Sequence, residues 1–278
     1  MFGDDTAPLG FRLGNGGAGH TGLLRKLCEV FIKRYDVEFR IEWVINHSRH
    51  TQIALLGDIV QVGLTYEPEW EDIGIAEGWA ERVTMAFHDR FMLVGPVSNP
   101  AGVIEGTDIK MAMRNVAAYG KDNAHTRHAL FHSRGDGSAT HYKECQLWGI
   151  CGVDLAHATS WRQRIPLTPY EALKKADQDE AYAITDRATF LTVVEDGAAS
   201  NLRVYVEDGK YLINPCAALI NLKAPMNQLA REFADWLATD EAQELIENFG
   251  KSWKQRLPIF APKTRIQVER RYALVSKL

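Results

Sequence analysis

Long hydrophobic runs are missing from this sequence of 278 residues. No stretch approaches the roughly 20 consecutive apolar residues that a helix needs to span a bilayer, so we expect no membrane insertion. An excess of positive charge is missing as well, because 32 basic residues stand against 36 acidic ones and the formal net charge is −4. Nucleic acids are bound by extended basic surfaces. The composition therefore argues against nucleic acid as a partner, and an anionic ligand would have to be held by local donors.

Cysteine is also scarce. The four cysteines have no Cys-x-x-Cys spacing and mostly lie in apolar patterns, which predicts buried thiols rather than a disulfide framework or a metal cluster. No His-Glu-x-x-His, P-loop or other metal-site spacing is present. We therefore expect no metal and no cofactor.

Two features bear on the compartment. Residues 1–14 lack the basic and apolar regions of a signal peptide, so either the chain is not exported or its leader was removed. The last three residues, Ser276-Lys277-Leu278, match a peroxisomal address, which has meaning only in a eukaryotic protein. The compartment stays open: periplasmic or extracellular after removal of a leader, peroxisomal or cytoplasmic in a eukaryote.

Short strand patterns alternate with amphipathic helices along the chain, which is typical of an α/β protein with mostly parallel sheets. The first strand precedes the glycine-rich segment 14–19 and a helix with one apolar stripe. The second strand ends before residues 46–49 (Asn-His-Ser-Arg), and a helix over 51–56 and a strand over 59–66 follow. In doubly wound sheets, ligands collect at the carboxyl ends of the strands. Both turns are therefore candidate ligand loops.

Two segments contain proline dipeptides of the kind expected where a strand crosses between lobes. Residues 92–102 read as a strand that ends in Gly-Pro and Asn-Pro, and residues 211–222 read as a strand interrupted at Asn214-Pro215. Two helices with apolar faces follow the second segment. We expect a chain that leaves one lobe and returns to it, with lobe 1 formed by residues 1–95 and 206–278 and lobe 2 by residues 96–205.

An oxyanion cradle is predicted at residues 133–141, Ser-Arg-Gly-Asp-Gly-Ser-Ala-Thr-His. The first turn of a helix carries unpaired N–H groups and a partial positive charge, and the hydroxyls of Ser138 and Thr140 would add donors. Arg134 supplies a full charge. The alternative is that Ser138 only caps a surface helix while Arg134 pairs with Asp136. The residues alone leave both interpretations open.

Two later motifs are candidates for the same cleft. Residues 168–171 form a capping box with proline at the first helical position, and this helix start could also face an anion. For Thr168 taken alone we favour the alternative, in which its hydroxyl serves its own helix. Residues 183–187 end a strand with a hydroxyl, a carboxylate and a guanidinium. We assign Asp186 and Arg187 to a structural ion pair, with Thr185 or Arg187 in the cleft as the alternative.

Two enzyme-like patterns are weak. Segment 14–19 matches G-x-G-x-x-G, but the predicted helix begins after its third glycine and Glu42 is misplaced for a ribose contact. A tight turn that brings bare backbone amides to a smaller anion fits better. Ser138, His141 and Asp136 lie close in sequence, but the glycines of a nucleophile elbow are absent. We therefore expect a protein that is not an enzyme.

Five segments occur in a specific order and spacing: VGPVSNPAG, SRGDGSATHYKECQLW, AYAITDRATF, INP and FADWLATDEAQELIENF. This combination spans roughly residues 10 to 250 and resembles the tungstate-binding, substrate-binding proteins of ABC importers and their relatives without a transporter. The resemblance implies a type II periplasmic-binding-protein fold, in which two doubly wound α/β lobes, joined by two crossover strands, close on an oxyanion.

The resemblance and the donor pattern together assign ligand binding to residues of four loops: Asn15, Gly16, Gly17, Ser48, Arg49, Arg134, Ser138, Ala139, Thr140, Thr168 and Tyr170. Several positions depart from the family. The first loop has bare amides and a carboxamide in place of hydroxyls, and the second adds an imidazole and a guanidinium. Tyr170 stands in a loop that is glycine-rich in the family and would close over a bulkier ligand, such as a small organic acid.

We therefore expect a monomeric solute-binding protein that captures a small oxyanion such as tungstate or molybdate, with an ABC permease as partner in a prokaryote. The alternative is an enzyme or sensor with this fold that acts on a small organic anion or a phosphate ester. The orientation of Asp136 would distinguish between protonated and fully deprotonated anions as ligands. A carboxylate facing the ligand would favour protonated phosphate, whereas one paired with Arg134 would favour fully deprotonated oxyanions. The sequence does not decide its orientation.

Overall fold

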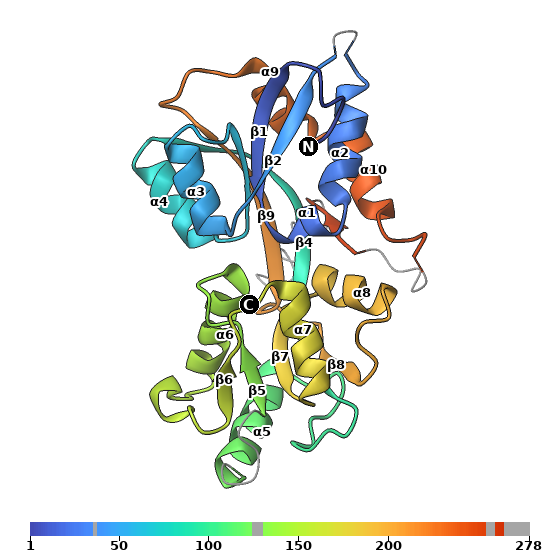
Figure 1. Cartoon of the computed structure of the whole chain (residues 1–278). Coiled ribbons are helices and arrows are strands. Elements are labelled where there is room, and N and C mark those ends of the chain that lie inside the picture. Colours follow the sequence, from blue (N-terminus) through green and yellow to red (C-terminus); the bar gives the residue numbers. More distant parts are fainter. Residues whose placement is uncertain (36–37, 124–129, 254–258, 264–278) are drawn as a thin grey trace, which may run out of the picture. The chain divides into compact units, whose positions relative to one another are not determined.

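A computed structural model describes residues 1–35, 38–123, 130–253 and 259–263 (Figure 1). The tripeptide Ser276-Lys277-Leu278 lies outside the described residues. The chain forms two compact units, unit 1 with residues 1–89 and 215–278 and unit 2 with residues 90–214. It passes from one unit to the other in two long strands, β4 (Ala80–Pro96) and β9 (Ile213–Asn221).

Strand β9 differs from the sequence-based expectation, because it runs through Asn214-Pro215 without interruption. Proline lacks the N–H that a strand donates to its neighbour. The pairing of β9 with β3 (Val62–Thr65) begins only at Ala217, opposite Thr65. This pairing therefore needs no N–H donor from Pro215.

Unit 1 contains a sheet in which β2 (Arg40–Ile45), β1 (Leu9–Asn15) and β3 are parallel neighbours and β9 joins antiparallel. Figure 1 shows helices on both sides of β1 and β2. The helices are α1 (Gly17–His20), α2 (Leu23–Ile32), α3 (Ser48–Leu56), α4 (Pro68–Ala76), α9 (Gln228–Trp236) and α10 (Asp240–Asn248), and a short strand, β10 (Ala261–Pro262), pairs with β4. The aromatic ring of Phe233 packs 5.4 Å from Phe11 and 5.1 Å from Phe31, which fixes α2 and α9 on β1.

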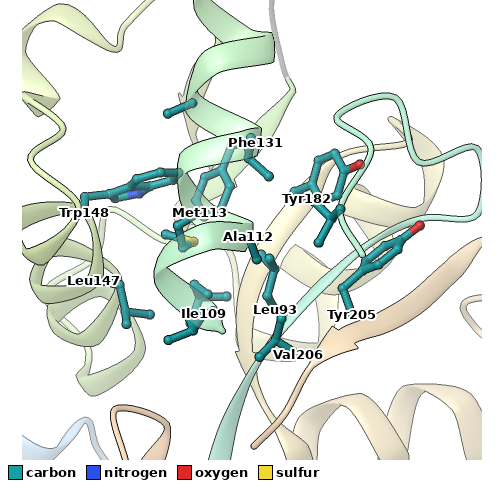
Figure 2. Close-up of a cluster of buried hydrophobic side chains, with 14 of the residues drawn as sticks. Leu93, Ile109, Ala112, Met113, Phe131, Leu147, Trp148, Tyr182, Tyr205 and Val206 are labelled. Atoms are coloured by element: carbon teal, nitrogen blue, oxygen red, sulfur yellow. The ribbon is translucent and has the colours of Figure 1, made fainter. Parts of the chain in front are cut away.

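Unit 2 has its own sheet. Strand β4 lies between β7 (Tyr182–Asp186) and β8 (Leu202–Val206), both antiparallel to it, while β7, β5 (Phe131–Ser133) and β6 (Arg162–Arg164) are parallel. The helices of this unit are α5 (Ile109–Asp122), α6 (Ala139–Ile150), α7 (Pro169–Gln178), α8 (Arg187–Glu195) and the short 3-10 helix η1 (Leu155–His157). Figure 2 shows the buried cluster that joins α5 and α6 to the sheet, with Met113, Phe131 and Trp148 in contact range of one another. The rings of Phe131 and Trp148 are 5.0 Å apart.

The direction of the parallel strands determines at which edge of each sheet the loops before the helices lie. Because β5, β6 and β7 run in one direction, their carboxyl ends lie at one edge of the unit 2 sheet, and α6, α7 and α8 begin there. In unit 1, β1 and β2 end side by side and lead into α1 and α3. Within the described residues, no helix combines the length and the hydropathy of a membrane-crossing segment.

A substitution at Gly95 in strand β4 would test the packing of unit 2. A Cβ at this position would lie 2.2 Å from the ring of Tyr182, so we expect Gly95→Ala to lower the free energy of unfolding by about 1–3 kcal/mol. Gly149 in α6 is the matched control, because a Cβ there meets no atom within 4 Å. Gly149→Ala should raise stability by about 0.5–1 kcal/mol through helix propensity. Urea unfolding of both variants measures the difference, and equal effects would contradict the assigned packing.

Candidate functional site

The predicted cradle is a loop that joins β5 to α6 in unit 2. Gly135 and Gly137 have φ angles of +59° and +74°, a region that side-chain-bearing residues rarely adopt. Between them, the Asp136 carboxylate pairs with the Arg134 guanidinium and also accepts the N–H of Ser138 at 3.0 Å. The glycines therefore turn the chain so that Asp136 binds residues on both sides of itself.

Helix α6 begins as predicted, with Ser138 as its N-cap. The Ser138 hydroxyl oxygen accepts the N–H of His141 at 3.3 Å, and its own proton remains available for donation. The N–H groups of Ala139 and Thr140 have no acceptor among the described residues, as expected for the first turn of a helix. The capping interpretation and the cradle interpretation are therefore compatible, since capping leaves three donors at this helix start.

A pocket of about 310 Å³, counted to its open mouth, lies beside this helix start within unit 2. Arg134 lines it, is only 7% exposed, and its Nε has no hydrogen-bond partner among the described residues. A buried guanidinium N–H without a partner is costly, so it marks a place where an acceptor is expected. Thr140 from α6 and Thr185 from β7 add hydroxyl groups to the lining.

Two lining residues, His132 and Ser133, were not among the predicted site residues. Both lie in β5, immediately before Arg134, and both are buried. The signal in the sequence was their position at the carboxyl end of a strand, and Ser133 is also the first residue of the predicted cradle segment. Apolar side chains from α7, from β7 and from the residue after β6 complete the lining: Ile165, Pro169, Ala172, Leu173, Ala183 and Ile184.

The two predicted residues of the α7 start are placed differently. Thr168 caps α7 and accepts the N–H of Glu171 at 3.3 Å, which is the local role favoured for it. The Tyr170 hydroxyl donates to Asp196 at 3.0 Å, and the pocket lining does not include this ring. Tyr170 therefore packs along α7 in the structure, held by the C-terminal end of α8, instead of covering the pocket.

The predicted ion pair between Asp186 and Arg187 is replaced by two separate interactions. Asp186 caps α8 and accepts from the N–H and the hydroxyl of Thr189, at 2.7 and 2.9 Å. Arg187 pairs with Glu207. A carboxylate at an N-cap is stabilised by the exposed N–H groups of its helix, which explains why Asp186 turns to α8.

The Ser138, His141 and Asp136 group does not have the geometry of a catalytic triad. Ser138 contacts the backbone of His141, while the Nδ1 atom of the imidazole accepts the N–H of Gly137 at 3.0 Å. A general base must reach the proton of its nucleophile. Here the histidine ring is used to close the loop instead, in agreement with the weak motif.

In unit 1, the first two predicted ligand loops lie next to each other. Asn46 donates its N–H to the carbonyl of Asn15, and a Cβ on Gly16 would lie 2.9 Å from the Asn46 carbonyl oxygen. Gly17 has open space around its Cα. The Asn15 side chain is fully buried and joins the Leu64 carbonyl to the N–H of Gly19, so it holds the loop together rather than extending from it.

Ser48 and Arg49 open helix α3 at the same edge. The buried Ser48 hydroxyl accepts the N–H of Tyr66 at 3.1 Å. Arg49 donates from Nε to the buried Glu67 at 2.9 Å and stacks over Trp70. Burial raises the pKa of Glu67, and the Arg49 charge opposes that rise. The structure thus gives Arg49 a structural partner that the sequence pattern did not indicate.

Cysteine and metal expectations can be compared with the described residues. All four cysteines are unpaired, Cys28 and Cys216 are fully buried, and burial raises the pKa of both thiols. Within the described ranges, no group of three or more His, Cys, Asp or Glu side chains is arranged to hold a metal ion.

His132 makes stability depend on pH. Its Nε2 lies 3.2 Å from Asp179 Oδ2, without hydrogen-bond geometry. Burial lowers the pKa of His132, and Asp179 opposes part of this shift. In the unfolded chain the imidazole titrates near 6.5, so below that pH the unfolded state binds a proton that the folded state does not. The folded protein therefore loses stability as pH falls, by up to about 1.4 kcal/mol per pH unit.

We expect His132→Asn to flatten this pH dependence between about pH 7.5 and pH 5.5. Urea unfolding at both values measures it, and the slope, not the absolute stability, is the relevant quantity. His157→Asn is the control, because the His157 side chain is 83% exposed. An unaltered slope in the His132 variant would contradict this assignment.

No family model matches the chain. Comparisons with known proteins nevertheless identify relatives of this chain. It is 30% identical over 250 residues to a Haloferax volcanii protein named for ABC-transporter anion binding, covering 84% of this chain and 67% of that one. It is 28% identical over 249 residues to the tungstate-binding protein TupA of Peptoclostridium acidaminophilum, covering 87% of this chain and 81% of TupA. The chain belongs to the TupA-like family of ABC-transporter anion-binding proteins.

The solved TupA from Desulfovibrio alaskensis G20 superposes on this chain with a TM-score of 0.75 at 25% identity, over 92% of this chain and 99% of TupA. The predicted fold class is thereby confirmed: the protein has the type II periplasmic-binding-protein fold of the TupA-like family. One of the motifs that pointed to this family, SRGDGSATHYKECQLW, forms the loop between β5 and α6 and most of helix α6 itself.

Proposed function

We propose that this protein is a solute-binding protein that captures a small, fully deprotonated oxyanion of the tungstate or molybdate type. The buried Arg134 carries the proposal. Within the part of the chain that the structure describes, its Nε lacks a partner, and it lines a pocket next to the N–H groups of Ala139 and Thr140, which have no acceptor there either. One full positive charge and several donors in a partly dry pocket suit a compact dianion. The names of the family relatives support the same ligand class.

Unit 1 contains a second group of candidate donors. We propose that the backbone of Gly16 and Gly17 and the start of α3 at Ser48 also bind the anion. These residues lie together at the carboxyl ends of β1 and β2, where α1 and α3 begin, and the N–H groups of a first helical turn have no acceptor within their helix. Asn15 and Arg49 then act behind these donors, Asn15 by holding the first loop and Arg49 through Glu67.

Asp136 supports a ligand without a proton. One carboxylate oxygen is bound to Arg134 and the other accepts the Ser138 N–H, so both are engaged within the loop. A hydrogen phosphate needs an acceptor for its proton, whereas tungstate, molybdate and sulfate need donors only. Two other polar groups of the lining, the Arg134 guanidinium and the Thr140 hydroxyl, have protons to donate.

We further propose that the protein acts by binding and not by catalysis, as a monomer that hands its ligand to an ABC permease. The relatives reported above are named for binding and transport. No observation favours the alternative of an enzyme acting on an organic anion or a phosphate ester, since the Ser138 and His141 side chains do not contact each other as nucleophile and base.

Calorimetric titration tests the function. Purified protein, freed of bound anions by partial unfolding and dialysis, is titrated with tungstate, molybdate and sulfate, with a nicotinamide dinucleotide and a small dicarboxylate as controls. We expect submicromolar binding of at least one oxyanion and no binding of the controls. Absence of binding to all three oxyanions would overturn the proposal.

A further inference from the structure

A buried ion pair lies behind the candidate pocket in unit 2. Arg162, the first residue of β6, donates from Nε to Glu144 of α6 at 2.7 Å, and their side chains are 7% and 2% exposed. Trp148 donates to the same carboxylate at 3.2 Å. A buried ion pair contributes little stability compared with apolar residues, because both charges lose their hydration. Its position therefore calls for a role other than stability.

The second contact of Arg162 supplies that role. Its Nη2 donates to the hydroxyl oxygen of Ser133 at 2.7 Å. Arginine has donors only, so it cannot receive the Ser133 proton in return. Among the described residues, the Ser133 hydroxyl donates to no protein acceptor, although Ser133 is only 1% exposed and lines the pocket with Arg134. A donor that is buried at a pocket wall and has no protein acceptor is available to a ligand.

We propose that Ser133 is a further ligand-binding residue and that Arg162 is its positioning residue. By occupying the Ser133 oxygen with a charged donor, Arg162 makes the hydroxyl donate into the pocket and strengthens it as a donor. Glu144 balances the charge of Arg162 and holds its guanidinium in place. The ligand oxygen that receives this proton carries no proton of its own. This inference rests on the proposed function, because the ligand is the oxyanion held by Arg134.

The test measures tungstate affinity by calorimetry in a double-mutant cycle. We expect Ser133→Ala to weaken binding by about 10-fold or more and Ser133→Thr, which keeps a hydroxyl, to recover most of the loss. Ser98→Ala is the matched control, because Ser98 is an exposed serine of the same unit and its removal should not change the affinity. Wild-type affinity in the Ser133→Ala variant would overturn the inference.

The second arm of the cycle tests Arg162. Removing Arg162 alone would leave Glu144 buried and unpaired, so both are replaced by apolar residues in Arg162→Met/Glu144→Leu, a change that buried ion pairs often tolerate. This variant should bind several-fold more weakly than the wild type when Ser133 is present, and should cause no further loss when Ser133 is already alanine. Equal losses in both backgrounds would show that Arg162 does not act through Ser133.

Folding is checked separately, by circular dichroism and thermal unfolding of each variant without ligand. A purely structural role for Arg162 would shift the unfolding temperature and leave the affinity of the folded protein unchanged, which contradicts the inference. Failure of the proposed function itself is recognised differently, because then the wild-type protein would bind none of the oxyanions.

Discussion

Arg134→Ala is expected to remove most of the oxyanion affinity while the protein stays folded. The substitution deletes the full positive charge of the pocket and leaves Asp136 without its partner, so a carboxylate that now repels anions remains close to the ligand. Truncating one partner of a buried, hydrogen-bonded charge pair typically costs about 2–5 kcal/mol. This corresponds to a loss in affinity of about 30-fold to several thousand-fold. Calorimetric titration with tungstate measures it.

Arg203→Ala is the control for this experiment. Arg203 belongs to the same unit, its side chain is half exposed, and its contact with Glu105 is long, at 4.0 Å. The variant loses the same formal charge, so unchanged affinity would show that a local contact matters and not the net charge of the protein. Tungstate affinity retained in Arg134→Ala would place the ligand at another site.

Discrimination against protonated anions is the second large effect. At about pH 8 sulfate and hydrogen phosphate carry nearly the same charge and differ by one proton. Since each oxygen of Asp136 already holds a donor of the protein, Asp136 is a weaker acceptor for the phosphate proton. Leaving one buried hydrogen-bonding group unmatched costs about 1–3 kcal/mol. We therefore expect sulfate to displace bound tungstate at concentrations about 10- to 100-fold lower than hydrogen phosphate does.

A second pair of anions distinguishes the effect of the anion's proton from the effect of its size. Selenate and hydrogen arsenate are both larger than the first pair and again differ by one proton, so they should show the same gap when each competes with tungstate. If hydrogen phosphate and hydrogen arsenate compete as well as their unprotonated partners, a carboxylate must face the ligand, and the assigned role of Asp136 would be wrong.

The features that the sequence predicted well are local ones. The start of α6 at Ser138 and the start of α7 at Thr168 follow from capping residues a few positions from the N–H groups that they satisfy. The strand-to-helix order of the chain follows from hydrophobic periodicity, which is also local.

The features that it missed depend on partners far along the chain. Asn15 contacts Leu64, Arg49 contacts Glu67 and Arg187 contacts Glu207, and in each case the pattern around the residue also fitted a ligand contact. A polar side chain at a loop can serve a ligand or a distant backbone group with the same chemistry. The choice depends on which group the fold brings within hydrogen-bonding distance.

By itself, the sequence determined the class of this protein: an α/β chain of the TupA-like family, with a helix start and an arginine suited to an anion in the segment 133–141. Only the tertiary structure decided how Asp136 is oriented and that Arg162 reaches Ser133. It also decided that Arg134 has an N–H at a pocket with no partner among the described residues. The physical reason is that helix capping and periodicity act within one or two turns of the chain. Burial and the pairing of polar groups, in contrast, arise only when parallel strands bring separate loops to one edge of a sheet.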